Sequence, residues 1–232
     1  MINKKIKKLS AFILLGLSLH TPAIFATPIE IRFFHVTSES HHKGRMAIKF
    51  TQLIEQRLGD KFSVKVFPNS ELYDNDVLDA LFGGDVELAA PSISKIRKYS
   101  SRYQVFDLPF LFSSPKAAKR FTEEEYGDRL LRSLRPSGIY DLGYLDNGMR
   151  QMSANKIFDS PGDMAGLKFR NNGPNIAEVW MAKLALDPVK LSFSKVYEEL
   201  ERGNIDGQVN TWPNIYSKKT PYTAEVHYRV KS

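Results

Sequence analysis

Apolar residues along the chain follow two spacings, one typical of buried strands and the other of amphipathic helices. The stretch "IEIRFFHV" (29–36) is rich in β-branched and aromatic residues and predicts a first strand. The run "FSVKVF" (62–67) predicts a second strand. Between them a helix is predicted from Gly44 to Gly59, where apolar residues recur at helical spacing: Met46, Phe50, Leu53, Ile54 and Leu58.

The same alternation continues to the end of the chain. A helix at 76–82 stops at Gly83-Gly84, and "VELAAPS" (86–92) predicts a short buried strand. Further elements predicted in chain order are a packed loop at 105–112, helices at 115–123 and 127–135, and extended segments at 139–146 and 150–155 around the turn dipeptide Asn147-Gly148. The second half predicts a strand ending at Arg170, a helix at 176–184, a strand at 189–191, a helix at 194–202 and a strand at 205–210.

Strands that alternate with helices are typical of parallel sheets wound by helices. We therefore predict an α/β protein with two lobes, lobe I at 27–147 and lobe II at 148–232. The sequence contains no internal repeat or low-complexity stretch, so this division rests on the pattern of elements alone.

The first 26 residues have the order of a secretory signal peptide. Four lysines precede an apolar stretch at 9–19, and Pro22 and small residues lead to a cleavage position after Ala26. An uncleaved N-terminal anchor is the alternative. Removing the four lysines lowers the net charge from +7 to +3. No dense basic run interleaved with aromatic residues follows, so we expect no nucleic-acid partner.

Composition is that of an ordinary soluble globular protein, with 42% hydrophobic and 25% charged residues. The absence of cysteine excludes disulfides, thiolate metal sites and a cysteine nucleophile. An exported protein without disulfides suits a bacterial periplasm, which is the predicted location.

Arg170 is the first candidate binding residue. It ends the apolar run "GLKFR" just before the polar stretch "NNGPN", which opens a helix, and so it is expected at the carboxyl edge of a sheet, where open α/β folds bind ligands. A guanidinium offers two parallel N–H donors that match a carboxylate, and such charge-assisted bonds contribute about 1.5–3 kcal/mol each. The alternative is a surface arginine that merely ends a strand.

Six stretches resemble one protein family in order and spacing: "PNSELYDNDVLDAL", "APSISK", "VFDLPFLF", "DNGMRQMSANK", "GLKFR" and "LSFSKVYEELERGNIDGQVNTWPNIYSKK". From about residue 29 to Lys219 the chain is similar to the extracytoplasmic solute-binding proteins of TRAP (tripartite ATP-independent periplasmic) transporters, in the branch that binds four-carbon dicarboxylates. The resemblance implies a two-lobed periplasmic-binding-protein-like fold with helix-wrapped sheets. It also implies closure over a small organic acid and its delivery to the membrane subunits of the transporter.

The resemblance assigns Arg170 to the ligand carboxylate and carries over three more positions: Arg150, Phe193 and Asn210. Lys95 and Asp74 lie in matching segments beside the cleft. Each has an alternative role. Arg150 could form a salt bridge to an aspartate such as Asp146, Asn210 could cap the helix near Trp212, Phe193 could be core, and Lys95 and Asp74 could be solvated.

The chain departs from the family pattern in three places. Val209 stands where the family usually has glutamate, which leaves any polar role of that position open. Pro221 falls where the family continues in helix. Family members continue well beyond Ser232, so we expect a C-terminally truncated version in which lobe II is incomplete.

Other functions have weaker support in the sequence. His35, Glu39, His41 and His42 cluster near a strand end, but adjacent histidines point in different directions and zinc needs three or four convergent donors, so a polar loop is preferred. The sequence contains no G-x-S-x-G, HExxH or phosphate-binding glycine motif of an enzyme. We expect no metal, no cofactor and no catalytic residue. A secreted enzyme and a fragment that no longer binds remain the alternatives.

Overall fold

The computed structural model describes residues 27–73, 76–171 and 176–218. Its strands are β1 (Ile29–His35), β2 (Phe62–Phe67), β3 (Leu88–Ala90), β4 (Arg150–Ala154), β5 (Lys168–Asn171), β6 (Asp187–Lys190) and β7 (Gly207–Thr211). Its α-helices are α1 (His42–Leu58), α2 (Val77–Gly83), α3 (Ile93–Ile96), α4 (Pro115–Glu123), α5 (Glu125–Arg132), α6 (Ile176–Lys183), α7 (Val196–Glu201) and α8 (Trp212–Ser217). Four 3-10 helices complete the list: η1 (Ser101–Asp107), η2 (Arg135–Ser137), η3 (Pro161–Met164) and η4 (Phe193–Lys195). The predicted signal peptide at 1–26 and Pro221 lie outside the described residues.

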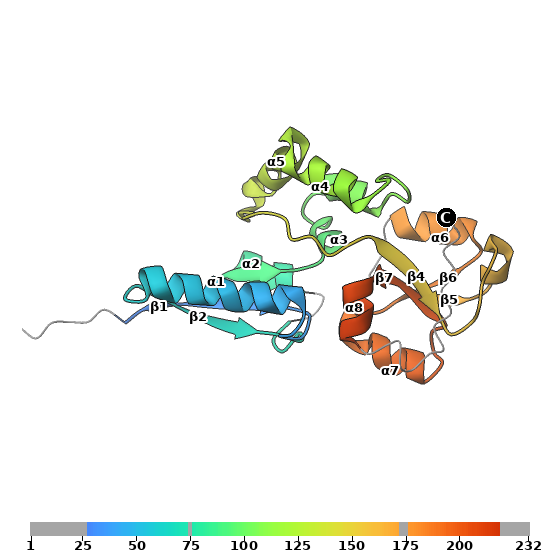
Figure 1. Ribbon diagram of the computed structural model, residues 1–232, viewed down its shortest axis with the longest axis horizontal. Helices are drawn as coiled ribbons and strands as arrows, with labels where there is room; N and C mark the ends of the chain where they lie inside the picture. The colour runs from blue at the N-terminus through green and yellow to red at the C-terminus, as the bar shows by residue number, and fades with distance from the viewer. Residues whose placement is uncertain (1–26, 74–75, 172–175, 219–232) are drawn as a thin grey trace, which may run out of the picture.

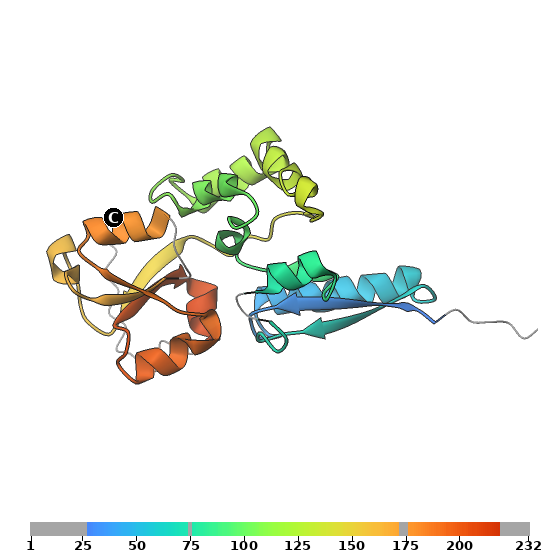
Figure 2. The same cartoon turned by 180° about the vertical axis from the view of Figure 1, so that it is seen from behind.

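The first sheet has the order β2-β1-β3, and all its strands are parallel. Phe33 of the central strand pairs with Val66 on one side and Leu88 on the other. The chain passes through α1 from β1 to β2, and then through α2 from β2 to β3, on the other side of β1. Because such parallel crossovers are right-handed, α1 and α2 lie on opposite faces of the sheet (Figures 1 and 2). This reversal between β1 and β3 opens a crevice at their carboxyl ends.

The second sheet has the order β4-β7-β5-β6. Strands β5, β6 and β7 are parallel, whereas β4 runs antiparallel to β7. The parallel part, β6-β5-β7, repeats the arrangement of the first sheet, with α6 and α7 on opposite sides (Figure 1). A second crevice therefore lies at the carboxyl ends of β5 and β7.

Each sheet has its own hydrophobic core. Phe34 and Val77 belong to the core of the first sheet, which also takes in Leu130 and Leu134 from the region of α5, so the helices after η1 pack with that sheet. Phe169 and Met181 are the largest fully buried residues of the core between the second sheet and α6. The structure thus confirms an α/β fold of helix-wrapped sheets. The predicted division between residues 147 and 148 falls in the connection between them and stays a prediction.

Two predicted segments differ in outcome along their length. Of the two extended segments around Asn147-Gly148, the second forms β4, which pairs with β7, whereas residues 139–146 belong to no strand. The segment at 105–112 is only partly packed. Its first half lies in η1, but Phe110 is 99% exposed, and Leu108 and Leu111 beside it are also exposed.

Among the helices of the described residues, none combines the length and apolar character that a membrane crossing requires.

Gly207 of β7 lies close to the backbone of β4 and to the Phe169 ring of β5, and we expect Gly207→Ala to destabilise the fold. An added Cβ would lie 2.5 Å from the carbonyl oxygen of Ser153 and 2.7 Å from the ring of Phe169. Overpacking of this kind typically costs about 1–3 kcal/mol of unfolding free energy, which urea unfolding would measure. Gly162→Ala is the control, because its nearest atom, Ser160 Oγ, would be 3.6 Å away. Equal stability of the two variants would contradict the packing argument.

Candidate functional site

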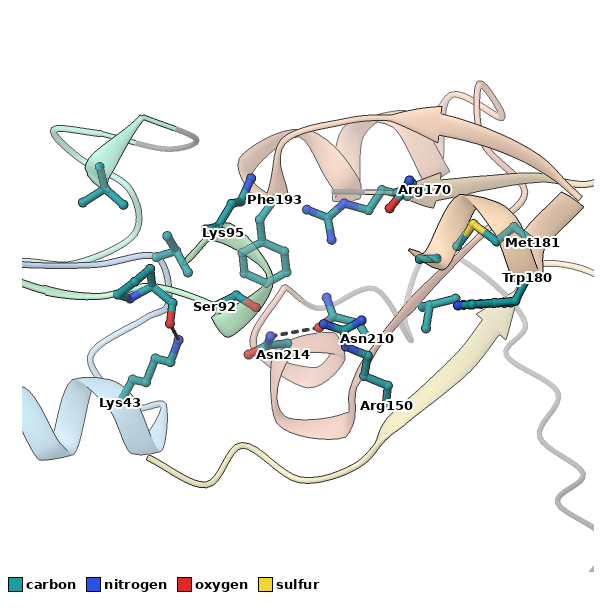
Figure 3. Close-up of a pocket in the computed structure, with 16 residues that line it drawn as sticks. Lys43, Ser92, Lys95, Arg150, Arg170, Trp180, Met181, Phe193, Asn210 and Asn214 are labelled. Atoms are coloured by element: carbon teal, nitrogen blue, oxygen red, sulfur yellow. Dashed lines mark hydrogen bonds between the residues drawn. The ribbon is translucent and has the colours of Figure 1, made fainter. Parts of the chain in front are cut away.

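The carboxyl ends of both sheets line one cavity (Figure 3). Its volume is about 60 Å³, and a buried water needs roughly 10–15 Å³ on the same scale, so it admits a small solute. The described side chains around it include four cations, Lys43, Lys95, Arg150 and Arg170, and no acid. Two cations come from the side of the first sheet and two from the second. The arrangement therefore favours an anion.

Arg170 sits near the carboxyl end of β5, as predicted, and is only 6% exposed. Its Nε donates to the carbonyl oxygen of Leu191 at 3.0 Å. Its guanidinium carbon lies 5.9 Å from the ring centroid of Phe193, within cation–π range. Figure 3 shows the guanidinium pointing into the space beside Phe193 and Asn210. The bond to Leu191 and the ring of Phe193 thus help to fix the direction of the charge.

Phe193 lies in η4 and is 7% exposed. It is both a core residue, packed with Val196 and Leu200, and part of the cavity wall. The two roles considered from the sequence are therefore compatible, because a core ring presents one face to the cation of Arg170.

Arg150 starts β4 and lines the cavity, but it has a partner in the protein. Its Nη1 lies 2.8 Å from Oδ1 of Asp107, whose side chain is 1% exposed. Asp146, which the sequence suggested as the partner, instead accepts a hydrogen bond from the backbone N–H of Gly148. Asp107 comes from η1, so the pair joins the two halves of the chain. The carboxylate of Asp107 also balances the charge of Arg150, which makes Arg150 less available to bind a ligand.

Asn210 is 8% exposed and lines the cavity from β7. Its Oδ1 accepts from the backbone N–H of Thr211 at 3.0 Å and from Nδ2 of Asn214 at 2.9 Å. Its Nδ2 donates to Gln208 Oε1 at 3.2 Å. The capping residue of α8 is Thr211, so Asn210 stabilises the start of this helix without being its cap. Asn214 also lines the cavity, and the sequence analysis missed it.

The remaining predicted positions differ in outcome. Lys95 of α3 lines the cavity, half-buried, whereas Asp74 lies outside the described residues. Val209 is also part of the wall and adds to an apolar surface that Trp180 and Met181 provide from α6. Five of the six predicted side chains are thus brought together, although their role in binding stays a prediction.

Lys43 is the cavity residue that sequence reasoning missed most clearly. It lies in the first turn of α1, is 5% exposed, and donates through Nζ to the carbonyl oxygens of Ala90 at 3.0 Å and Pro91 at 3.4 Å. Burial lowers the pKa of Lys43 to about 8. A lysine in the first turn of a helix opposes the helix dipole, and this signal could have identified it.

One of the neighbouring histidines, His41, caps a helix. His41 precedes α1, and its Nδ1 accepts from the backbone N–H of Lys43 at 3.1 Å, which caps the helix. Burial, with smaller contributions from nearby cations, lowers the pKa of His35 and of His41 to about 4. Among residues 27–73, 76–171 and 176–218, no group of three or more His, Cys, Asp or Glu side chains is arranged to hold a metal ion.

Comparisons with known proteins show the family and the fold to which the chain is similar. The family model described as bacterial extracellular solute-binding protein, family 7 (DctP) matches residues 33–228. The C4-dicarboxylate-binding periplasmic protein DctP of Shewanella loihica is 45% identical over 219 residues, which are 94% of this chain and 64% of that protein. The chain thus spans less than two thirds of this relative's length.

Two solved structures are similar in fold as well. A TRAP periplasmic solute binding protein from Shewanella oneidensis, with bound succinate, has a TM-score of 0.83 and 46% identity, covering 85% of this chain and 65% of that chain. One from Pseudomonas aeruginosa PAO1, with bound L-malate, has a TM-score of 0.81 and 38% identity, covering 85% and 69%.

The Arg150–Asp107 pair generates a stability prediction. Arg150→Met removes the ion-pair partner of the buried Asp107 carboxylate and is expected to lower the unfolding free energy by about 1–3 kcal/mol. Adding Asp107→Asn should recover part of this loss, so the two substitutions are non-additive in urea unfolding. Arg129→Met, which breaks an exposed pair with Glu125, is the control with little effect. Additive effects of the two substitutions would show that the pair is not coupled.

Proposed function

We propose, because the chain belongs to family 7 of the bacterial extracellular solute-binding proteins, that it captures an organic anion between two lobes and delivers it to a TRAP membrane permease. The anion is a four-carbon dicarboxylate. Arg170 holds one of its carboxylates, and no chemical step is involved.

One observation carries this proposal. The cavity is lined by four cationic side chains and, among the described residues, by no acidic one. Electrostatic attraction is stronger where water is excluded, so a cavity wall rich in cations favours a bound anion. Asp107 forms an ion pair with Arg150. A dianion would meet cations from both walls of the cavity.

Arg170 is suited to hold a carboxylate because its orientation is set before the ligand arrives. The bond from its Nε to Leu191 and the ring of Phe193 fix the guanidinium plane. A prearranged donor loses less side-chain freedom when the ligand binds, which favours affinity. The amide of Asn210 lies in the same wall and is itself oriented by α8.

The relatives support a ligand with four carbon atoms. Similar proteins are named for C4-dicarboxylates, and two similar structures contain succinate and L-malate. A protein from Advenella mimigardefordensis, 26% identical, is described with galactonate, so a sugar acid is the competing ligand class. Higher identity to the first group supports the dicarboxylate.

Closure and location are parts of the same proposal. We take residues 27–147 and 148–232 as lobes that move about the connection between the two sheets, since the cavity has walls from both. Hinge closure of this kind is characteristic of periplasmic binding proteins. The lysine-rich, apolar N-terminus would direct the chain to the periplasm.

We expect Arg170→Gln to lower succinate affinity at least about 100-fold, since it removes two charge-assisted bonds. Calorimetric titration of the purified chain with succinate, malate, fumarate and galactonate measures this, and thermal unfolding without ligand checks that the variant folds. Arg202→Gln is the matched control, because Arg202 pairs with Glu198 on the surface. Arg170→Lys, which keeps the charge but loses the planar fork, should be intermediate.

Three results would contradict the proposal. Succinate affinity that is unchanged in Arg170→Gln would remove the assigned role of Arg170. Turnover of a titrated acid would favour a secreted enzyme. A folded chain that binds none of the four acids would favour a non-binding fragment.

A further inference from the structure

Lys43 is a buried cation that the proposed function has not yet used. It is 5% exposed, lines the cavity, and enters it from α1, on the side of the first sheet. Figure 3 shows Lys43 and Arg170 on opposite sides of the pocket region. From this placement we infer that Lys43 binds the second carboxylate of the ligand, so that each sheet contributes one cation to one dicarboxylate. The inference rests on the proposed function and names the group that selects diacids over monoacids.

The hydrogen bonds of Lys43 leave a donor for the ligand. An ammonium has three N–H donors. Two of them are directed to the carbonyl oxygens of Ala90 and Pro91, at the carboxyl end of β3. These two bonds fix Nζ at the edge of the first crevice without neutralising its charge. The third donor and the full positive charge are available to an anion.

The surroundings of Lys43 supply no compensating acid. Among the described residues no aspartate or glutamate forms an ion pair with it, and burial alone shifts its pKa. The groups that face it are His35, His41 and His42, whose pKa values are all lowered, first by burial. They are neutral at pH 7 and do not repel an anion. Arg45, on the same turn, is exposed and donates to the backbone of Ser40.

The other cations fit the second carboxylate less well. Arg150 already has the buried carboxylate of Asp107 at 2.8 Å. Lys95 is half-buried on α3 and can be reached by solvent. Lys43 is therefore the most desolvated of the three, and an anion that reaches it gains the most, because electrostatic attraction is stronger where water is excluded.

A structural role is the competing explanation. The bonds from Lys43 to Ala90 and Pro91 tie the start of α1 to the end of β3, so the side chain could serve packing alone. In that case replacing Lys43 would change stability and leave the binding of succinate unaltered. The two explanations differ in the ligand dependence of the effect.

The test compares Lys43→Met with the wild-type chain. We expect succinate affinity to fall at least about tenfold in calorimetry, the loss that corresponds to one charge-assisted bond. Affinity for monomethyl succinate, which has one free carboxylate, should change less than twofold. Lys49→Met is the matched control, because Lys49 is exposed on the same helix. Equal succinate affinity in Lys43→Met and wild type would overturn the inference.

A second measurement needs no variant and covers the case in which Lys43→Met fails to fold. Because the pKa of Lys43 is about 8, the free chain loses this proton as the pH rises above that value. Succinate affinity of the wild type should then fall by up to about tenfold per pH unit above about pH 8, since binding requires the protonated amine. The histidines titrate at lower pH and do not contribute there. A flat profile to about pH 9.5 would overturn the inference.

Failure of the inference and failure of the proposed function give different results. If the wild type binds succinate, Arg170→Gln abolishes binding and Lys43→Met has no effect, only the role of Lys43 is wrong. If the wild type binds no acid, the proposed function is wrong and the role of Lys43 fails with it.

Discussion

Positive charge held between two sheets is the constraint on which the rest of this structure depends. Arg170 and Lys43 are each less than a tenth exposed, and they line the same cavity from different sheets. Burying charge opposes folding unless the charged group has partners. The partners of Arg170 include a carbonyl oxygen and an aromatic ring, and those of Lys43 include two carbonyl oxygens. These groups help to fix the direction of each charge.

The fold brings these groups together by using the same topology twice. In each sheet the next parallel strand is added on one side of the first strand, β1 or β5, and the one after it on the other side. The loops that follow these strands diverge at their carboxyl ends. Lys43 follows β1, Arg170 lies near the carboxyl end of β5, and Asn210 lies on β7. The cavity has a wall from each sheet. The Arg150–Asp107 pair links η1, which follows the first sheet in the chain, to β4 of the second sheet.

The local sequence pattern was sufficient to predict most helices and strands and the position of Arg170. It was not sufficient to predict contacts between segments that are distant in the sequence. Arg170 was predictable because a strand, an arginine and a helix start follow one another directly, and the carboxyl edge of a sheet is a general binding position. The partner of Arg150 was not, because Asp107 lies on a separate helix and only tertiary packing brings it near. Lys43 carried a weaker signal, a cation at a helix N-terminus, and nothing local indicates that it is buried. Phe110 shows the converse, since an apolar residue is no guarantee of burial.

The most direct test of the account is a crystal structure of the mature chain grown with succinate. The account predicts one succinate between the two sheets, with a carboxylate at hydrogen-bond distance, about 2.7–2.9 Å, from the guanidinium of Arg170. A succinate bound outside this cavity, or an Arg170 side chain turned away from a succinate inside it, would contradict the central claim.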